Sequence, residues 1–243
     1  MKRNQKIIWG LAAALMAGTA FAQKAGDNIF SVGLASINSD VSLGKLTNQG
    51  PDPATTAALN NIGFVGASAT VSSETTISAS WLHMYTDNLG AEFTFGRPPR
   101  VTQGLNTPGM AALAKPTSHS GAARISIWTP TIVGKYFFGT PAEQWRPYVG
   151  LGVSRVSFHK IDINGSDATV MGLAGYDANM TSSWAPVYSA GLIYKLNDKW
   201  SVTGSVAYIP IKTTATFTGV AGVTTGDVKL ETIDYVVRVG YRF

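Results

Sequence analysis

The last twelve residues, Thr232–Phe243, read TIDYVVRVGYRF and alternate in character from one position to the next. Every odd position carries an apolar or aromatic side chain, whereas the even positions are mostly polar, charged or small. A period of two is typical of a β-strand whose two faces meet different surroundings. A half-buried strand of a soluble β-sandwich could show the same alternation, so the rest of the chain has to decide whether this strand belongs to a sandwich or to another β fold.

The first 22 residues have the three parts of a secretory signal peptide. A basic start (Lys2, Arg3 and Lys6) precedes the apolar run IIWGLAAALMAG, and an A-x-A pattern ends at Ala22. The apolar run is shorter than the roughly 20 residues that a membrane-spanning helix needs. We therefore expect export, cleavage after Ala22 and one mature barrel domain over residues 23–243.

The composition is unusual for a soluble exported protein. Only 14% of the residues are charged and 45% are hydrophobic, whereas about 25% charged is common in soluble domains. Without the predicted leader, 16 basic residues face 14 acidic ones, so no basic surface for nucleic acid is indicated. The sequence has no cysteine and no later segment that resembles a spanning helix. A closed β-barrel is the other structure that satisfies its own backbone in lipid.

Eight segments show the alternation of the C-terminal stretch. Short connections (86–90, 139–143 and 196–199) and long ones (roughly 38–74, 97–123, 159–182 and 213–231) separate them in strict turn. The pattern predicts an all-β fold, an eight-stranded antiparallel transmembrane up-and-down β-barrel with both termini on the short-turn, periplasmic side. The segments are NIFSVGLASIN, TTISASWLHMY, AEFTFG, SIWTPTIVGKYFFG, QWRPYVGLGVSRV, WAPVYSAGLIYKL, KWSVTGSVAYIPI and TIDYVVRVGYRF.

The apolar faces carry tryptophan and tyrosine near the strand ends. Such rings are typical of the headgroup level of a membrane. The alternative is the core of a soluble protein, but the glycines and hydroxyls of the opposite face suit a narrow lumen better than solvent. Phe243 would then close the last strand on the lipid face, at the periplasmic rim.

The inward positions combine small residues with charged ones. Opposite charges in a dry lumen are expected to pair and to plug it near the periplasmic end, a role that we favour over substrate contact. An eight-stranded barrel has room for its own side chains or for one small ligand. The lumen-lining candidates are Glu92, Thr94, Lys135, Arg146, Ser189, Ala207, Asp234, Arg238 and Arg242.

Prolines mark where the wall could open, because proline lacks the N–H that a strand ladder needs. Pro98 and Pro99 end the third strand, Pro130 starts the fourth, and Pro210 is expected to interrupt the seventh near the outer rim. One hypothesis is a wall that is locally unzipped toward the loop end near the third and fourth strands. The alternative is that these prolines only terminate strands.

An enzymatic barrel is the competing class, and the sequence offers little for it. A lipid-modifying barrel needs a nucleophile with a nearby base. Of the three histidines, His83 has lipid-facing parity, His119 lies in a loop and His159 lies at a strand end. No metal site or cofactor site is indicated, so we expect a protein that is not an enzyme and has no cofactor.

Several stretches together resemble the outer membrane protein W family: WRPYVGLGVSRVSF, AGLIYKLNDKWSVTGSVAYIPIKTTATF, YTDNLGAEF, PTIVGKYFFG and the closing VGYRF. The resemblance implies an eight-stranded barrel with an apolar lumen that passes small hydrophobic molecules, with lateral release through a gap in the wall. Some relatives serve alkane uptake, and others are receptors for bacteriocins. Tyr241 and Phe243 resemble the signal that barrel-assembly machinery reads. Thr94 and Ala207 stand where the family leads us to expect bulky gate residues.

We therefore expect a monomeric barrel of the bacterial outer membrane that gives small hydrophobic molecules passive passage. The expected partners are membrane lipid, the hydrophobic solutes and the assembly machinery. The alternative is a non-conducting structural or receptor barrel that acts through its extracellular loops, with a lipid-modifying enzyme as the less favoured reading.

Overall fold

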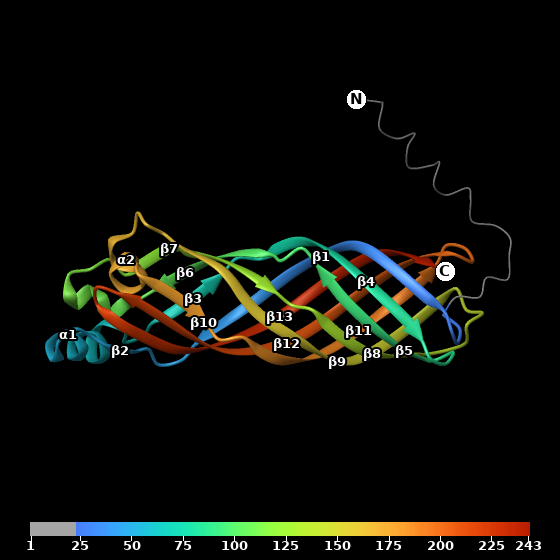
Figure 1. Cartoon of the computed structure of the whole chain (residues 1–243), viewed down its shortest axis with the longest axis horizontal. Helices are drawn as coiled ribbons and strands as arrows, with labels where there is room; N and C mark the ends of the chain where they lie inside the picture. Colours follow the sequence, from blue (N-terminus) through green and yellow to red (C-terminus); the bar gives the residue numbers. More distant parts are fainter. Residues whose placement is uncertain (1–22) are drawn as a thin grey trace, which may run out of the picture.

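Eight antiparallel strands close into a ring in the computed structural model, which describes residues 23–243 (Figure 1). Each strand pairs with its neighbours in the chain, and the last strand pairs with the first from Ile29↔Arg242 to Leu43↔Val228. The predicted all-β, eight-stranded barrel is confirmed. The ring consists of β1 (Asn28–Leu43), β4 (Glu74–Met84), β5 (Leu89–Gly96), β8 (Thr131–Phe137), β9 (Trp145–Ile163), β11 (Ser183–Lys195), β12 (Trp200–Gly219) and β13 (Gly222–Arg242).

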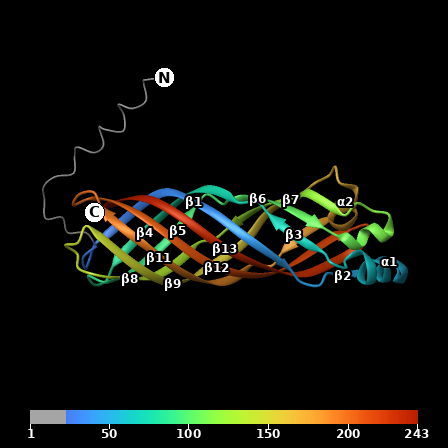
Figure 2. The ribbon, with the colours of Figure 1, turned by 180° about the vertical axis from the view of Figure 1, so that it is seen from behind.

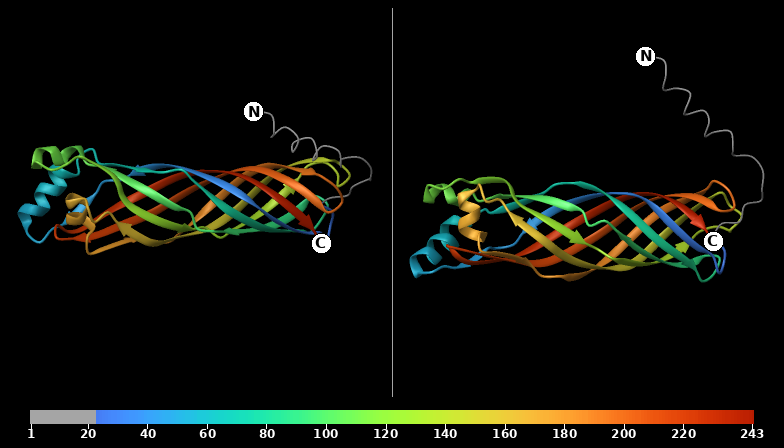
Figure 3. Two further views of the ribbon diagram at one scale, coloured as in Figure 1. Left: turned by 90° about the horizontal axis from the view of Figure 1, so that it is seen from above. Right: turned by 45° about the horizontal axis from the view of Figure 1, so that its top comes forward.

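The two ends of the barrel differ. One end, here called the turn end, holds the short connections 85–88, 138–144 and 196–199 together with the C-terminus (Figure 2). The opposite loop end carries the helices (Figure 3), and among the described residues no helix is long and apolar enough to cross a membrane. The predicted signal peptide lies outside the described residues. The helical elements are α1 (Pro53–Ala58), η1 (Leu59–Gly63), η2 (Pro108–Leu113) and α2 (Ala168–Ala174).

Additional strands extend the wall beyond the ring at the loop end. The connection expected over 97–123 contains a second hairpin, β6–β7, and β7 pairs with the upper part of β9. This hairpin continues β5 and β8 past Pro98, Pro99 and Pro130, so the wall goes on beyond the prolines. The additional strands are β2 (Thr47–Gln49), β3 (Ser68–Val71), β6 (Arg100–Asn106), β7 (Ser118–Trp128) and β10 (Asp177–Met180).

Two expectations about the last hairpin are wrong. The stretch 213–231 is no loop, because β12 and β13 remain paired as far as Gly219↔Gly222 and turn tightly there, with Gly222 at a φ of 96°. Pro210 does not interrupt β12 either. Its partner on β13 is Glu231, while the register of β12 with β11 ends at Tyr208, so the missing N–H is tolerated where that pairing has stopped.

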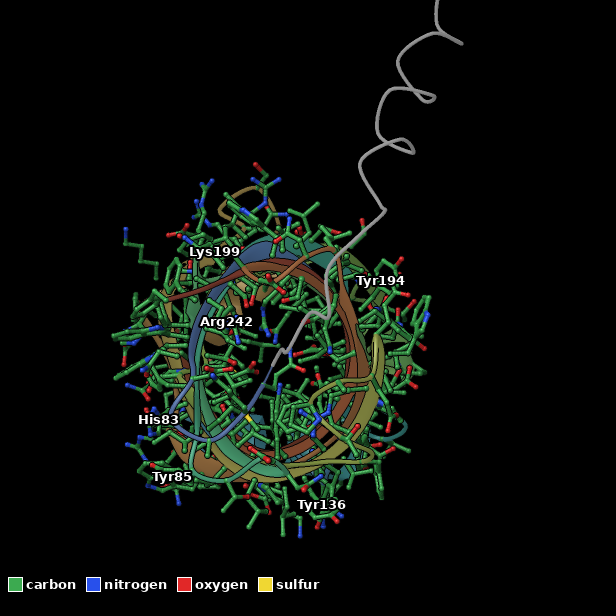
Figure 4. All side chains as sticks on the ribbon, turned by 90° about the vertical axis from the view of Figure 1, so that its right-hand side faces the viewer. His83, Tyr85, Tyr136, Tyr194, Lys199 and Arg242 are labelled. Atoms are coloured by element: carbon green, nitrogen blue, oxygen red, sulfur yellow. The ribbon has the colours of Figure 1, made fainter. Side chains whose placement is uncertain are left out.

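The outer face of the ring is apolar and the inner face is buried. Seen from the turn end, Tyr85, Tyr136 and Tyr194 point away from the ring, whereas Arg242 lies inside it (Figure 4). On the outer face, Leu34 and Leu151 are 57% and 64% exposed. A continuous apolar band of this kind would be a liability in water and suits lipid. Outward rings pack in pairs across strands, with centroids 4.3 Å apart for Trp145 and Tyr194.

The inward side chains form three apolar clusters along the barrel. A small cluster around Met84, Phe137 and Tyr148 lies at the turn end. The largest, which includes Val101 and Ile125, fills the middle and the loop half of the barrel, and a third lies among the loop-end helices. The interior is therefore apolar through most of its length.

Candidate conduction path

A buried ionic cluster crosses the lumen in its lower half. Glu92 of β5 accepts from Lys135 of β8 at 2.8 Å and from Arg238 of β13 at 3.4 Å, and the three side chains are 9%, 3% and 5% exposed. Arg238 also donates to Ser78 Oγ at 2.7 Å, and Ser80 Oγ donates to Glu92 at 3.3 Å. Register puts all three on the inner face. Glu92 and Lys135 lie on the paired strands β5 and β8, whereas Arg238 of β13 reaches them only because the ring closes. We call Glu92, Lys135 and Arg238 the floor.

A second layer of cations lies between the floor and the turn end. Arg146 is fully buried and donates to the carbonyl oxygens of Gln23 at 2.6 Å, Asp87 at 2.7 Å and Phe138 at 3.4 Å. Arg242 pairs with Asp27 at 3.2 Å. These contacts draw the segment before β1 across the mouth of the barrel.

Lys195 belongs to the same layer and donates to the carbonyl oxygen of Pro141. In this layer Arg146 and Lys195 donate to backbone carbonyl oxygens, whereas Arg242 bonds to the Asp27 carboxylate. Sequence reasoning missed Gln23 and Asp27 because they precede the first strand, and Asp87 because it lies in the turn after β4; neither place has alternation. Gln23 and Asp27 are buried while the three residues between them are exposed, a pattern that no strand period predicts.

Asp234 departs from the expected pairing of opposite charges. Its Oδ1 is buried and has no hydrogen-bond partner, because Arg238 is directed toward Ser78 and Glu92 instead. Its register partners are Ala207 of β12 and Ile37 of β1. The small Ala207 side chain leaves space beside the carboxylate.

The two remaining candidates lie at opposite sides of the ring. Thr94 of β5 donates from Oγ1 to Glu92 at 3.3 Å, so its hydroxyl belongs to the edge of the floor. Ser189 of β11 pairs in register with Ala207 and Gly150, and its buried Oγ has no hydrogen-bond partner. Neither side chain is bulky enough to form a gate by itself.

Above the floor, apolar cavities follow one another toward the loop end. A cavity of about 30 Å³ in the middle of the barrel is lined by Asp234 and by apolar side chains such as Phe158 and Leu230. A larger one, about 90 Å³, lies under α2 and is lined by Leu46, Leu173 and their neighbours. Its walls are almost entirely apolar, so these spaces suit hydrocarbon better than ions.

The wall has a break where β4 and β5 end their pairing. The ladder stops at Ser78↔Gly96 and is followed by one bond from the Arg97 N–H to the Ile77 carbonyl oxygen. Pro98 and Pro99 come next and offer no N–H to β4. Pairing on the other side resumes at once, since the Ile127 N–H donates to the Pro99 carbonyl oxygen at 3.1 Å. The break therefore lies on the β4 side of the prolines.

A cavity of about 70 Å³ occupies this break and has lining residues from both faces of the wall. Asp234 and Ile209 line it from within, while Phe95 and Trp128, which are 39% and 49% exposed on the outer face, line it from outside. A further hollow of about 260 Å³ on the outer side is bordered by 74–77 and 97–100. We call this region the wall opening.

Two of the three histidines, His83 and His119, make structural contacts. His119 is buried, and its Nδ1 lies 2.6 Å from Asp167 Oδ2, at the start of α2. Burial opposes ionisation of Asp167, but hydrogen bonds from the Val170 N–H and from His119 outweigh it and hold the pKa of this carboxyl below its usual range. His83 Nδ1 lies 2.9 Å from Asn28 Oδ1. Within residues 23–243 no cluster of side chains could hold a metal ion.

The two residues predicted to guide assembly lie at the turn end. The Tyr241 ring packs against Trp200 with centroids 5.0 Å apart, and Phe243 is 70% exposed. The Phe243 N–H donates to the carbonyl oxygen of Asn28, so the terminus is held in the closing pair of strands. Their role in assembly stays a prediction.

Comparison with known proteins agrees with this geometry. The chain is 30% identical over 98% of its length to outer membrane protein W of Vibrio cholerae, all of which is covered. It is also 30% identical to outer membrane protein W of Salmonella typhi, with 94% of each chain covered. The crystal structure of OprG from Pseudomonas aeruginosa has the same fold, with a TM-score of 0.76 at 24% identity over 93% of this chain and 99% of that one.

The OmpW family model matches residues 24–243, nearly everything that the structure describes. Family membership accounts for the ring of eight strands and the apolar outer band, and it places the protein in the outer membrane. It also agrees with the expectation that the protein is not an enzyme. The chain is a member of the OmpW family of outer-membrane β-barrel proteins.

Proposed function

We propose that this barrel gives small hydrophobic molecules passive passage from the loop end into the lumen and releases them sideways through the wall opening. The observation that carries the proposal is the order of the parts along the barrel. Apolar cavities lie above, an ionic floor closes the lumen below, and the wall opening lies between them.

The floor argues against straight passage to the turn end. An apolar solute that moved past Glu92, Lys135 and Arg238 would have to separate buried ion pairs without replacing their hydrogen bonds, which is costly. Below the floor, Arg146 and the segment 23–27 fill the mouth. The path of least resistance for hydrocarbon is therefore the opening beside Pro98 and Pro99.

Passage requires side-chain movement. The cavities in the column hold about 90, 30 and 70 Å³ and are separated by packed apolar side chains. These contacts are nondirectional and can be exchanged for contacts with a hydrocarbon at little cost. A slow, selective conduit for apolar solutes fits this interior better than an open aqueous pore does.

The first experiment is uptake of a medium-chain alkane by cells that carry the wild-type chain, no chain, or the double variant Thr94→Trp with Ala207→Trp, at equal amounts of folded barrel. We expect faster uptake with the wild type than without the chain, and loss of the gain when the lumen is filled. Equal uptake in all three strains would overturn the proposal and favour a receptor or structural barrel that acts through its loops.

The exit through the wall opening is tested by restoring the backbone N–H groups that Pro98 and Pro99 lack. Pro98→Val with Pro99→Val returns two N–H groups to the chain after β5. Consecutive N–H groups point to opposite edges of a strand, so the one directed toward β4 lets that ladder extend. We expect alkane uptake to fall severalfold. The matched control is Pro186→Val in β11, a proline that lies in a paired strand and lines none of the cavities described above. An equal effect of both changes, or of neither, would argue against this exit.

A further inference from the structure

We infer that Asp234 forms a head-group site for neutral amphiphiles, in which its carboxylate accepts a hydrogen bond from the hydroxyl of a short or medium-chain alcohol. The inference rests on the proposed function and adds a solute class to it. The alkyl tail would lie in the apolar cavities that meet at Asp234. The evidence is an unpartnered oxygen, its position and the charge around it.

The unpartnered oxygen is the first step. A buried carboxylate oxygen that accepts no hydrogen bond costs free energy. A ligand that brings a donor recovers this free energy when it binds. Asp234 Oδ1 has no partner among the described residues. The other two acids of the lumen are occupied, since Glu92 holds Lys135 and Arg238, and Asp27 holds Arg242.

The position is the second step. Asp234 lines both the cavity in the middle of the barrel and the cavity in the wall opening. The two spaces also share Thr129 and the apolar residues Ile37, Pro99, Ile127 and Ile209. A solute that leaves the column through the wall must therefore pass this carboxylate, with apolar side chains around its tail.

The charge balance selects the kind of head group. Two carboxylates, Glu92 and Asp234, face two cations, Lys135 and Arg238, in this part of the lumen. A neutral hydroxyl leaves that balance unchanged. An alkylammonium ion would add an unmatched positive charge, and a fatty acid anion would meet Asp234 with a charge of the same sign. An alkane brings no donor at all.

A purely structural role for Asp234 makes a different prediction. If the residue only balances Arg238, the loss of charge matters and the loss of an acceptor does not. Asp234→Asn and Asp234→Leu both remove the charge, but the asparagine retains a carbonyl oxygen that accepts a hydrogen bond. The two variants therefore separate a head-group site from a charge-balancing residue.

The test is photo-crosslinking in lipid vesicles with a diazirine-bearing 1-alkanol and the matching diazirine-bearing alkane, followed by mass spectrometry of peptides that contain Ile127 and Ile209. We expect the alkanol to label these peptides in the wild type and to be displaced by excess 1-octanol. Labelling by the alkanol should fall about tenfold in Asp234→Leu. It should stay within about threefold of the wild type in Asp234→Asn, and labelling by the alkane should not change in either variant.

Equal labelling by alkanol and alkane in the wild type, or an equal fall in both variants, would overturn the inference. Alkane uptake, measured on the same variants at matched amounts of folded barrel, keeps the two ideas apart. If the wild-type chain does not increase alkane uptake, the proposed conduction is refuted, and the labelling alone decides whether Asp234 is a head-group site. If alkane uptake is normal but the labelling does not favour the alkanol over the alkane, only the head-group site is refuted.

Discussion

Glu92→Gln should be among the most destabilising single changes in this barrel, although it alters only one oxygen. The glutamate is 9% exposed and lies 2.8 Å from Lys135 Nζ and 3.4 Å from Arg238 Nη1. Glutamine keeps the volume but leaves two buried cations against a neutral amide. Breaking a buried ion pair from one side costs about 3–5 kcal/mol. Arg238 retains its bond to Ser78 Oγ, so Lys135 should account for most of the loss.

A double variant tests whether the stranded Lys135 ammonium causes the loss of stability. Adding Lys135→Met to Glu92→Gln removes the stranded ammonium, so the double variant should be more stable than Glu92→Gln alone by about 2 kcal/mol, within the range of coupling between residues in contact. The surface control is Asp162→Asn. Its pair with Arg100 is more than half exposed, and the change should cost less than about 1 kcal/mol.

The assay is a urea titration of the barrel refolded into lipid vesicles, followed by tryptophan fluorescence, with the free energy of unfolding taken from linear extrapolation. A Glu92→Gln barrel within about 1 kcal/mol of the wild type would mean that water reaches the floor and screens it. A double variant no more stable than Glu92→Gln would mean that the two charges are not coupled. Either result would remove the closed floor on which the sideways path depends.

Two further perturbations have effects that follow from the structure. Gly33→Ala should lower the free energy of unfolding by at least about 2 kcal/mol, since an added Cβ would lie 1.9 Å from the Val237 carbonyl oxygen. Gly204→Ala is the control and should be neutral, because an added Cβ there has nothing within 4 Å. The yield of folded barrel on a gel compares the two variants. The ionised Asp167 carboxylate stabilises the start of α2 above its ordinary pKa of 3.8, and this contribution is lost as the pH falls through the lowered folded-state value. Proteolysis of the 164–176 loop should therefore accelerate below about pH 4 in the wild type, whereas in Asp167→Asn it should be fast at neutral pH and flat across this window.

The ring could be predicted from the sequence because its signal is local. Within the membrane belt every outward position must be apolar, and every odd position from Ile233 to Phe243 carries an apolar or aromatic side chain. The same strand above the belt was mistaken for a loop. There the outward face of β12 meets water, and residues such as Thr214 and Thr216 face out while Ala215 and Phe217 face in. The pattern of an apolar outward face is therefore reversed there, although the strand continues.

For the site, the sequence predicts which charged residues face the lumen but not which of them pair. Alternation identifies Glu92 and Arg238 as inward, but they lie 146 residues apart and meet only when the barrel closes. The sequence therefore indicates which charges enter the lumen, and closure decides their pairing. Asp234 was expected to pair because opposite charges in a dry lumen attract each other. The structure leaves its Oδ1 unpaired because Arg238, the cation on the same strand, bonds to Ser78 of β4 and Glu92 of β5 across the lumen.

The height of the wall opening decides where a released solute would go. From Leu89 at the turn end to Pro98, nine residues at about 3.4 Å each, tilted by about 40°, rise about 23 Å along the barrel axis. The apolar band of a barrel of this class is about 25 Å tall. The opening therefore lies near the top of the hydrocarbon layer, beside the outward Phe95 and Ile77. A solute that leaves there enters lipid on the side of the loop end, and the floor below never has to open.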